Sequence, residues 1–283
     1  MPSIRSSPAP SFWENQQLSP DSILLSDRVA VVTGAAQGIG KATAIALARF
    51  GADVAVCDRD AEGLADTVAQ IEALGRGSCS AVMDVRDEDA VQAFLAQVKA
   101  RFGTVHVLVN NAGGGFWSEF LAVNAKGENA LVRENFGSVT HFLRATVPLM
   151  TEGGSIVNVT SVEGHRAGPG FAIYSAMKAA VANLTKSLSM EFASRMIRIN
   201  CIAPDMIPTP GDAGLMTDSD AVGLPEVEAK SWPEEGSSWD CAAAVIFLAS
   251  DLSRFITGST VHIDGGTEAA GGWKVMKKGG FSL

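Results

Sequence analysis

The sequence contains little cysteine, histidine or tyrosine, and it has more acidic than basic residues. Its 283 residues include four cysteines, four histidines and one tyrosine. No CxxC pair occurs, and no cysteine stands near a histidine at ligand spacing, which argues against a metal site. The net charge of -9 disfavours nucleic acid and anionic membranes as partners. We expect reduced, buried cysteines in a cytoplasmic protein.

Long apolar runs are also missing. No stretch approaches the roughly 20 apolar residues that cross a bilayer. Residues 1–26 are rich in Ser and Pro, and their single short apolar run is too short for a secretory signal. We interpret residues 1–26 as an N-terminal extension that is either flexible or packs on a neighbouring subunit.

The sequence does contain a regular alternation of short apolar runs and segments of helical period. Apolar residues make up 47% of the chain, which is ample for a core. Strands are expected at Val29–Thr33, Val54–Asp58, Cys79–Asp84, Val105–Asn110, Ser155–Ser161, Ile197–Ala203 and Thr260–Asp264. Helices are expected near 39–50, 61–74, 87–101, 130–150, 174–194 and 239–250. This alternation predicts an α/β fold, a doubly wound parallel sheet of about seven strands flanked by helices.

The predicted fold occupies residues 27–268 as one domain, followed by a C-terminal tail at 269–283. In such sheets, ligands bind beyond the carboxyl ends of the strands. Residues 204–238 interrupt the alternation with five prolines and many acidic residues. A loop this long in a compact domain is usually functional or disordered. We interpret it as a mobile lid over the ligand crevice, the alternative being a surface insertion.

A glycine-rich turn joins the first predicted strand to the first long helix. Its residues are Thr33, Gly34, Ala35, Ala36, Gln37, Gly38, Ile39 and Gly40. Glycine permits the tight turn, the approach of backbone to a pyrophosphate and close packing of helix on strand. The helix N-terminus then offers N–H groups to phosphate oxygens. The turn therefore predicts a dinucleotide cofactor.

The spacing of this turn, TGxxxGxG, resembles that of the short-chain dehydrogenase/reductase family. Three further motifs extend the resemblance from about Arg28 to Gly266. They are the NNAG motif at Asn110, Asn111, Ala112 and Gly113, the YxxxK motif at Tyr174 and Lys178, and Ser161 thirteen residues before Tyr174. The resemblance implies a nicotinamide-dependent oxidoreductase with a Rossmann-type fold, and it implies a homotetramer.

Asp58, at the end of the second predicted strand, favours NAD over NADP. A carboxylate there accepts the ribose hydroxyls and repels a 2′-phosphate. Gln37 is neutral where NADP-preferring relatives often have a basic residue, whereas Arg59 argues in the opposite direction. By resemblance, Asp84 and Val85 contact adenine, and a helix cap is the alternative role of Asp84.

Tyr174 and Lys178 form a pair suited to proton transfer. A tyrosine acts as base only as phenolate, and lowering its pKa from about 10 to about 7 takes roughly 4 kcal/mol. One positive charge at about 4 Å supplies roughly that much at an effective dielectric constant near 20. Lys178 lies one helical turn after Tyr174 on the same face, and Tyr174 is the only tyrosine.

The resemblance assigns the remaining roles at the site. Ser161 orients the substrate oxygen, with Thr160 as a neighbouring rival, and Asn135 binds a water in a proton relay. Ile207 and Thr209 belong to a PGxIxT-like segment that meets the nicotinamide, although Asp205 replaces its glycine. Candidate pocket residues are mostly bulky and apolar, namely Gly114, Gly115, Phe116, Trp117, Glu163, Phe171, Met206, Leu215, Met216 and Trp232.

These features predict an NAD-dependent enzyme that interconverts a secondary alcohol and a ketone on a hydrophobic small molecule. One alternative is an NADPH-dependent reductase of 3-oxoacyl thioesters. Another, of a different class, is a regulatory protein that binds NAD without turnover. The complete set of Ser161, Tyr174, Lys178 and Asn135 argues against the regulatory protein.

Overall fold

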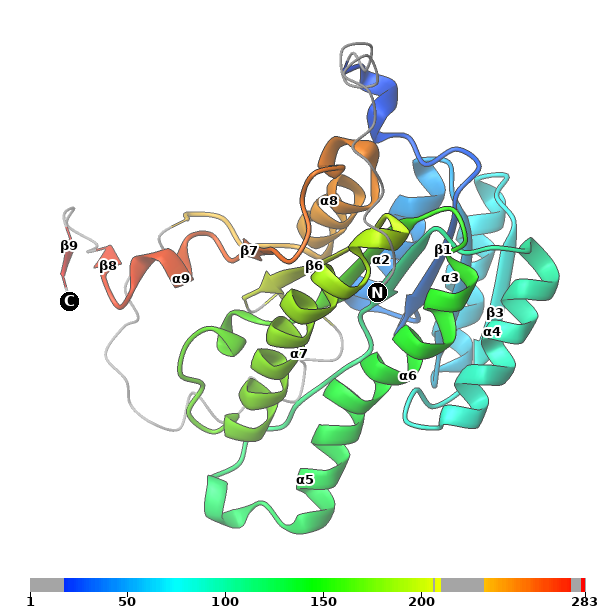
Figure 1. The fold of residues 1–283 in the computed structure, drawn as a ribbon. Helices are drawn as coiled ribbons and strands as arrows, with labels where there is room; N and C mark the ends of the chain where they lie inside the picture. The colour runs from blue at the N-terminus through cyan, green and yellow to red at the C-terminus, as the bar shows by residue number, and fades with distance from the viewer. Residues whose placement is uncertain (1–17, 206, 210–231, 276–280, 283) are drawn as a thin grey trace.

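A parallel sheet with helices on both faces forms the centre of the molecule (Figure 1). The computed structural model describes residues 18–205, 207–209, 232–275 and 281–282. Seven strands lie in the order β3-β2-β1-β4-β5-β6-β7, and all are parallel. This confirms the predicted doubly wound α/β fold. Strands β1 and β4 lie side by side at the centre, where the strand order reverses, so a ligand crevice is expected above them.

The strands match the predicted apolar runs within a few residues. They are β1 Val29–Thr33, β2 Asp53–Asp58, β3 Ser78–Val82, β4 Val107–Asn110, β5 Gly154–Val159, β6 Ile197–Pro204 and β7 Thr260–Ile263. The inner strands β1 and β4 are buried at every position, as a sheet covered on both faces requires. The edge strands β3 and β7 are only partly buried, because each has a neighbour on one side only.

The helices also follow the predicted segments, with one difference after β4. They are α2 Gly38–Arg49, α3 Ala61–Ala73, α4 Glu88–Phe102, α5 Ala125–Val132, α6 Ser138–Thr146, α7 Ala172–Glu191, α8 Ser238–Ala249 and α9 Thr267–Ala270. The predicted helix near 130–150 begins earlier, since the Asn124 side chain accepts a hydrogen bond from the Gly127 N–H (2.9 Å) and caps α5. A π-helical turn, Arg133–Gly137, separates α5 from α6.

Two apolar clusters hold the layers together. The first joins the sheet to α2, α3 and α8, and the second joins the opposite face to α4, α6 and α7. The N-terminal part of the core starts before the predicted domain boundary at residue 27. Leu25 is 1% exposed, and its N–H donates to the Phe50 carbonyl oxygen at 2.7 Å.

Several predicted features fall at the margins of the described residues. The predicted lid lies mostly outside them, because 206 and 210–231 are not described. The C-terminal segment begins with α9 and runs away from the sheet to the short strands β8 Lys274–Val275 and β9 Phe281–Ser282 (Figure 1). Within the described ranges, no helix has the length and apolar character needed to cross a membrane.

Candidate active site

The glycine-rich turn between β1 and α2 has the geometry that its sequence predicts. Gly34 and Gly38 have positive φ values of 67° and 57°, a region that disfavours L side chains. A β-carbon on Gly40 would overlap the Gly34 carbonyl oxygen, so only glycine lets α2 approach β1 this closely. Gln37 is the N-cap of α2, and its side chain makes no capping hydrogen bond. The Gln37 side chain therefore leaves the backbone N–H groups of the first turn, at the positive end of the helix dipole, uncapped.

Asn111 and Thr33 fasten this turn to the end of β4. The Thr33 hydroxyl accepts hydrogen bonds from the Asn111 N–H (3.0 Å) and the Ala112 N–H (2.9 Å). The Asn111 side-chain amide donates to the carbonyl oxygens of Thr33 and Gly34, both at 3.0 Å. Asn111 thus shapes the glycine-rich turn through its side chain. Thr33, which the sequence named only as the first residue of the turn, accepts two of these four hydrogen bonds.

The Asp58 carboxylate stands at the carboxyl end of β2, beside the turn. One of its oxygens accepts the Ala36 N–H at 2.9 Å and the other accepts the Asp60 N–H at 3.0 Å. Each carboxylate oxygen has more than one acceptor site, so both can accept further donors. Arg59 turns away towards Glu134, with which it pairs at 3.7 Å, and its side chain is 64% exposed. The Asp58 carboxylate, and not the Arg59 guanidinium, is therefore held at the glycine-rich turn.

Asp84 lies beyond β3, which ends two residues earlier at Val82. Its carboxylate is paired with the Arg86 guanidinium, at 2.9 Å to Nε and 2.5 Å to a terminal nitrogen. Hydrogen bonding from Arg86 holds the pKa of Asp84 below its usual range. The cap of α4 is Asp87, so the alternative role of Asp84 as a helix cap is wrong. Val85 is buried in the core cluster that includes α4.

Lys178 is buried beneath Tyr174 on α7. Its Nζ donates to the Val159 carbonyl oxygen at 3.0 Å and lies 5.4 Å from the centroid of the Tyr174 ring. The side chain is 5% exposed, and burial lowers the pKa of Lys178 to about 8. The carbonyl of Val159 could not be identified from the sequence, because a backbone acceptor has no side-chain signature.

Asn135 occupies the π-helical turn between α5 and α6 and is 1% exposed. Its amide nitrogen donates to the Gly114 carbonyl oxygen (2.8 Å) and the Leu131 carbonyl oxygen (3.0 Å), and its Oδ1 accepts the Gly114 N–H (3.2 Å). Single π-turns within helices are frequent at functional sites. The bulge turns Asn135 towards the loop after β4.

The glycines after Asn111 bring these residues together. A β-carbon on Gly113 would lie 2.8 Å from Asn135 Oδ1 and 3.1 Å from Lys178 Nζ. A β-carbon on Gly115 would lie 3.2 Å from Cδ2 of Tyr174. The Gly113–Gly115 backbone therefore runs directly against three of the predicted site residues. The structure places Gly113, Asn135, Tyr174 and Lys178 in one cluster.

Ser161 lies just beyond β5, which ends at Val159 and not at Ser161 as the sequence predicts. Ser161 is the N-cap of a short 3-10 turn, and its Oγ accepts the Glu163 N–H at 3.2 Å. The Thr160 hydroxyl instead donates to the Ile202 carbonyl oxygen at 2.8 Å and is buried. The Thr160 hydroxyl therefore bonds to β6, whereas Ser161 lies two residues beyond Val159, whose carbonyl oxygen binds Lys178.

The segment after β6 returns to the glycine-rich turn. Ile207 is buried in the core, and a β-carbon on Gly38 would lie 3.1 Å from Thr209 Cβ. Asp205 pairs with the Arg166 guanidinium at 3.3 Å. Burial raises the pKa of the nearby Glu163 carboxyl, and the positive charge of Arg166 partly offsets this rise. Met206, Leu215 and Met216 of the predicted pocket lie outside the described residues.

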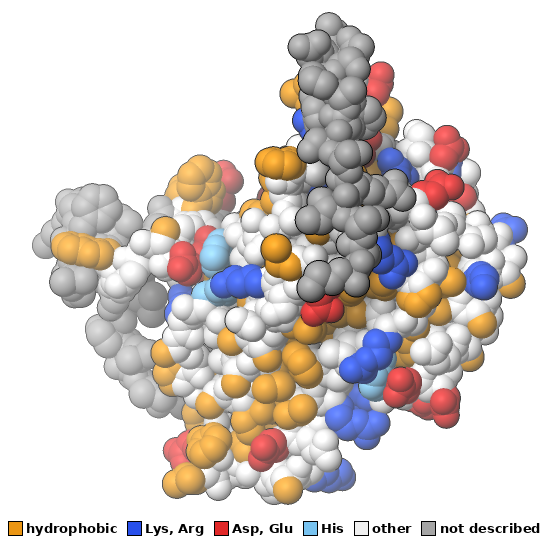
Figure 2. Space-filling model, viewed as in Figure 1, with side chains coloured by type: hydrophobic (Ala, Val, Ile, Leu, Met, Phe, Trp, Pro, Cys, Tyr) orange, Lys and Arg blue, Asp and Glu red, His pale blue; other side chains and the backbone are white. Residues whose placement is uncertain are grey.

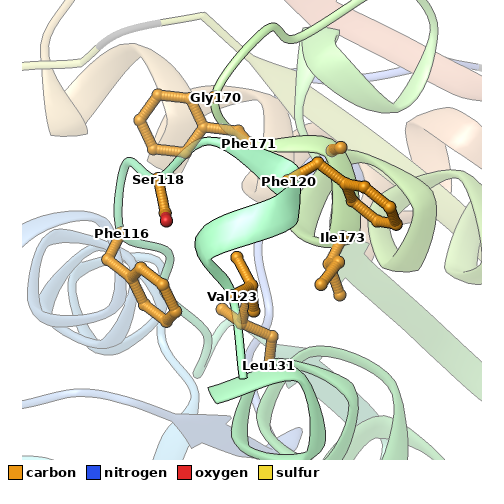
Figure 3. A pocket seen from close by; sticks show the side chains of 9 residues that line it. Phe116, Ser118, Phe120, Val123, Leu131, Gly170, Phe171 and Ile173 are labelled. Atoms are coloured by element: carbon orange, nitrogen blue, oxygen red, sulfur yellow. The ribbon is translucent and has the colours of Figure 1, made fainter. Parts of the chain in front are cut away.

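A small apolar hollow lies beside the site, between the loop after β4 and the start of α7 (Figure 3). Figure 3 shows Phe116, Val123 and Leu131 on one side of it and Phe171 above the turn at Phe120. The Phe171 and Tyr174 rings meet edge to face at 6.3 Å between centroids. Phe171 therefore links this hollow to Tyr174. Among the described residues, no group of acidic, His and Cys side chains could hold a metal ion.

Comparison with known proteins places this architecture in a family. The chain matches the family model described as enoyl-(acyl carrier protein) reductase over residues 34–268. It is 37% identical over 246 residues to the 3-oxoacyl-acyl-carrier-protein reductase of Thermotoga maritima, an alignment that covers 86% of this chain and 98% of the relative. The chain is a short-chain dehydrogenase/reductase. The resemblance seen in the sequence is thereby confirmed, and the protein belongs to a family of oxidoreductases.

Solved structures of the same family superpose over most of the chain. Carveol dehydrogenase from Mycobacterium avium in complex with NAD has a TM-score of 0.79 and 29% identity, covering 85% of this chain and 97% of its own. Levodione reductase has a TM-score of 0.81 and 31% identity, covering 87% of this chain and 99% of its own. These relatives share the short-chain dehydrogenase/reductase fold and differ in the substrates their names state.

Proposed function

We propose that the protein is an NAD(H)-dependent oxidoreductase that interconverts a secondary alcohol and a ketone on a hydrophobic small molecule. The observation that supports this most strongly is the cluster of Tyr174, Lys178 and Asn135 against the Gly113–Gly115 backbone. Ser161 follows β5 two residues after Val159, whose carbonyl oxygen binds Lys178. A buried lysine beneath a tyrosine is suited to moving a proton to and from a substrate oxygen.

The residues around the glycine-rich turn fit a dinucleotide. Gly34, Gly38 and Gly40 carry no side chains at the N-terminus of α2, and the Thr209 side chain lies against Gly38. The Asp58 carboxylate, held by two backbone N–H groups, is positioned to accept two ribose hydroxyls. A 2′-phosphate in the same place would meet this negative charge, which favours NAD.

The remaining cofactor contacts that we propose follow the loops around the crevice. Gln37 and Ile39 supply backbone to the phosphates, and Asp84 and Val85 lie where adenine is expected. Asn111, Ala112 and Gly113 form one wall, and Ile207 and Thr209 form another. Arg59 lies at the edge of the ribose site. Asp84 is paired with Arg86. Asp84 can therefore contact adenine only if this ion pair opens or if the carboxylate binds Arg86 and adenine at once.

In the alcohol-to-ketone direction, a nicotinamide cofactor held by the glycine-rich turn and Asp58 would supply the hydride acceptor for the alcohol carbon. Ser161 donates a hydrogen bond to the substrate oxygen and holds it against Tyr174. Tyr174, as phenolate, takes the hydroxyl proton, and the Lys178 charge stabilises that phenolate. Asn135 fixes Gly114 by reciprocal hydrogen bonds, and its Oδ1 retains acceptor capacity for a water that continues the proton path. The reverse direction uses the same groups with the proton returned.

The side chains that border Tyr174 favour an apolar substrate. Phe171 meets the Tyr174 ring edge to face, and the small hollow that Phe171 lines together with Phe116 is mostly apolar. The exposed Trp117 lies against Gly170, next to Phe171. Glu163 is the exception, and its burial-raised pKa suits a contact with a polar substituent of the substrate. A cyclic alcohol or ketone fits this combination of surfaces.

The proposal is tested by titrating NADH and NADPH separately into the protein and following tryptophan fluorescence, with Asp58→Ala alongside. Tight NADH binding, weak NADPH binding and a relaxed preference in Asp58→Ala are expected. Glu62→Ala is the matched control, because Glu62 is an exposed acidic residue in the first turn of α3 near Asp58. An NADPH preference in the unaltered protein would contradict the role of Asp58.

A second candidate is an NADPH-dependent reductase of 3-oxoacyl thioesters. Two observations favour it: the 37% identity to a 3-oxoacyl-acyl-carrier-protein reductase and the exposed Arg59 next to Asp58. NADPH preference together with turnover of a 3-oxoacyl thioester would place it first. NADH binding with no turnover of alcohols, ketones or thioesters would instead favour the regulatory protein.

The proposal extends to assembly and location. We expect a homotetramer with interfaces on the helices between 87 and 150 and on α7. Figure 2 shows hydrophobic side chains gathered over the lower part of the face on which α5 and α7 lie, and Leu121 and Met190 are 94% and 79% exposed. Light scattering after gel filtration measures the assembly. The unpaired cysteines suit the cytoplasm.

A further inference from the structure

A row of polar side chains crosses the sheet under α7. The residues Asn110 of β4, Asn158 of β5 and Cys201 of β6 are register partners on adjacent strands. Each is at most 3% exposed, and Asn110 Nδ2 donates to Asn158 Oδ1 at 2.8 Å. Because side chains alternate along a strand, the row lies on one face of the sheet. The row is polar within an otherwise apolar cluster.

Thr185 of α7 sits on this row. Its Oγ1 accepts a hydrogen bond from Asn158 Nδ2 at 2.9 Å and another from the Cys201 thiol at 3.2 Å, and Thr185 is 1% exposed. The other contacts of this part of α7 with the sheet are apolar, through residues such as Val181 and Leu188. Apolar contact is non-directional, whereas a buried hydrogen bond requires a defined distance and angle. Thr185 therefore fixes where α7 lies along and across the sheet.

The same helix is tied to β5 at a second point. Lys178 Nζ donates to the carbonyl oxygen of Val159, the residue that directly follows Asn158. Thr185 lies seven residues after Lys178, which is two helical turns and nearly the same face. Two neighbouring residues of β5 thus hold α7 at two places separated by about 10 Å along its axis.

This arrangement determines how close the Lys178 charge lies to Tyr174. The ammonium group is held by the sheet through Val159, whereas the Tyr174 ring moves with the backbone of α7. A shift of α7 on the sheet therefore changes their separation, which is 5.4 Å from Nζ to the ring centroid. Near this distance each ångström changes the pKa of the phenol by about 0.4 units at an effective dielectric constant of about 20.

We propose that Asn158 and Thr185 are positioning residues that set the placement of α7 and, through it, the proton affinity of Tyr174. The inference rests on the proposed acid/base role of Tyr174. It goes beyond that role, because neither residue touches the crevice. The pair acts through a buried hydrogen bond one layer below the reacting groups.

The single tyrosine of the chain allows a test without substrate or cofactor. Tyrosinate absorbance, measured by ultraviolet difference titration against Tyr174→Phe, reports the ionisation of Tyr174 alone. Thr185→Val keeps the shape of the side chain and removes the acceptor. We expect its midpoint to rise by about 0.4 pH unit or more, and we expect Thr185→Ser to restore the midpoint of the unaltered protein.

Two further variants calibrate the result, and a third replaces Thr185→Val if that variant does not fold. Ser189→Ala is the matched control, because its hydroxyl is buried on the same helix but bonds within it, to the Lys186 carbonyl oxygen at 2.7 Å. It should leave the midpoint unchanged. Lys178→Met removes the charge itself and should raise the midpoint more than Thr185→Val does. If Thr185→Val fails to fold, Cys201→Ala removes the weaker of the two hydrogen bonds and should give a smaller rise.

The possible outcomes separate this inference from the proposed function. A midpoint that rises in Lys178→Met but not in Thr185→Val overturns the positioning role and leaves the proposed function standing. Equal rises in Thr185→Val and Ser189→Ala also overturn it, since any loosening of α7 would then suffice. An unchanged midpoint in Lys178→Met contradicts the role of Lys178 in the proposed function and the inference together.

Discussion

Replacement of Lys178 by methionine should raise the pKa of Tyr174 by about 2 units. The substitution keeps the length of the side chain and removes its charge. At the 5.4 Å between Lys178 Nζ and the Tyr174 ring centroid, a unit charge stabilises the phenolate by about 3 kcal/mol at an effective dielectric constant of about 20. This energy corresponds to about 2 pKa units.

The pH dependence follows from the sign of each shift. Burial lowers the pKa of Lys178 to about 8, so the ammonium charge is present below that pH and is lost above it while Tyr174 is neutral. Ionisation of Tyr174 in turn favours the charged lysine, so the two groups titrate as a pair. Alcohol oxidation needs the phenolate and should rise with pH. In Lys178→Met the rise should begin about 2 pH units higher.

The assay is kcat/KM for alcohol oxidation against pH, measured together with the tyrosinate titration. Lys186→Met is the control, because Lys186 is an exposed lysine on the same helix and its charge faces solvent. Coincident shifts of the kinetic and spectroscopic midpoints in Lys178→Met alone are expected. Profiles for Lys178→Met that overlay those of the unaltered protein would refute the electrostatic reasoning.

Three other substitutions test the scaffold of the site. Gly40→Ala places a β-carbon against the Gly34 carbonyl oxygen. It should lower the free energy of unfolding by about 3 kcal/mol, measured by thermal melts, and abolish NADH binding, measured by fluorescence titration. Thr33→Val leaves the Asn111 and Ala112 N–H groups unpaired and should cost about 2 to 4 kcal/mol in denaturant unfolding, whereas an unchanged midpoint would refute the clamp. Gly170→Ala places a side chain at a positive φ of 82°, and its β-carbon would overlap the Trp117 indole. It should therefore lower the free energy of unfolding by about 2 kcal/mol and alter tryptophan emission. Gly114→Ala is the control, because its β-carbon meets no neighbouring atom and should leave the free energy of unfolding unchanged.

The strands and the glycine-rich turn could be predicted from the sequence because they depend on local patterns. Val29–Thr33 is a continuous apolar run, and β1 has the same bounds. The helix after β4 was harder to place, since α5 begins at Ala125, where Asn124 is a cap with no apolar period before it. The π-helical turn that holds Asn135 has no pattern of its own. Asparagine in mid-helix was its only signal.

Contacts made through the backbone could not be predicted in the same way. The Val159 carbonyl that binds Lys178 and the Gly114 backbone that binds Asn135 are available to any residue type at those positions. The Asn111 motif was assigned to the cofactor, and in the structure its side chain holds the turn. Nothing in the sequence around Thr185 distinguishes it from other helix residues, because its contacts depend on which strands lie beneath it. Such roles follow from tertiary packing and not from spacing.

The central claim is that this crevice transfers a hydride to nicotinamide with Tyr174 as the acid/base. It is tested most directly by following NADH formation from NAD and a series of cyclic secondary alcohols, with Tyr174→Phe in parallel. The account predicts turnover of at least one alcohol by the unaltered protein and unchanged NADH binding with no turnover by Tyr174→Phe. Equal turnover by Tyr174→Phe, or NADH binding with no turnover of any alcohol or ketone by the unaltered protein, would contradict it.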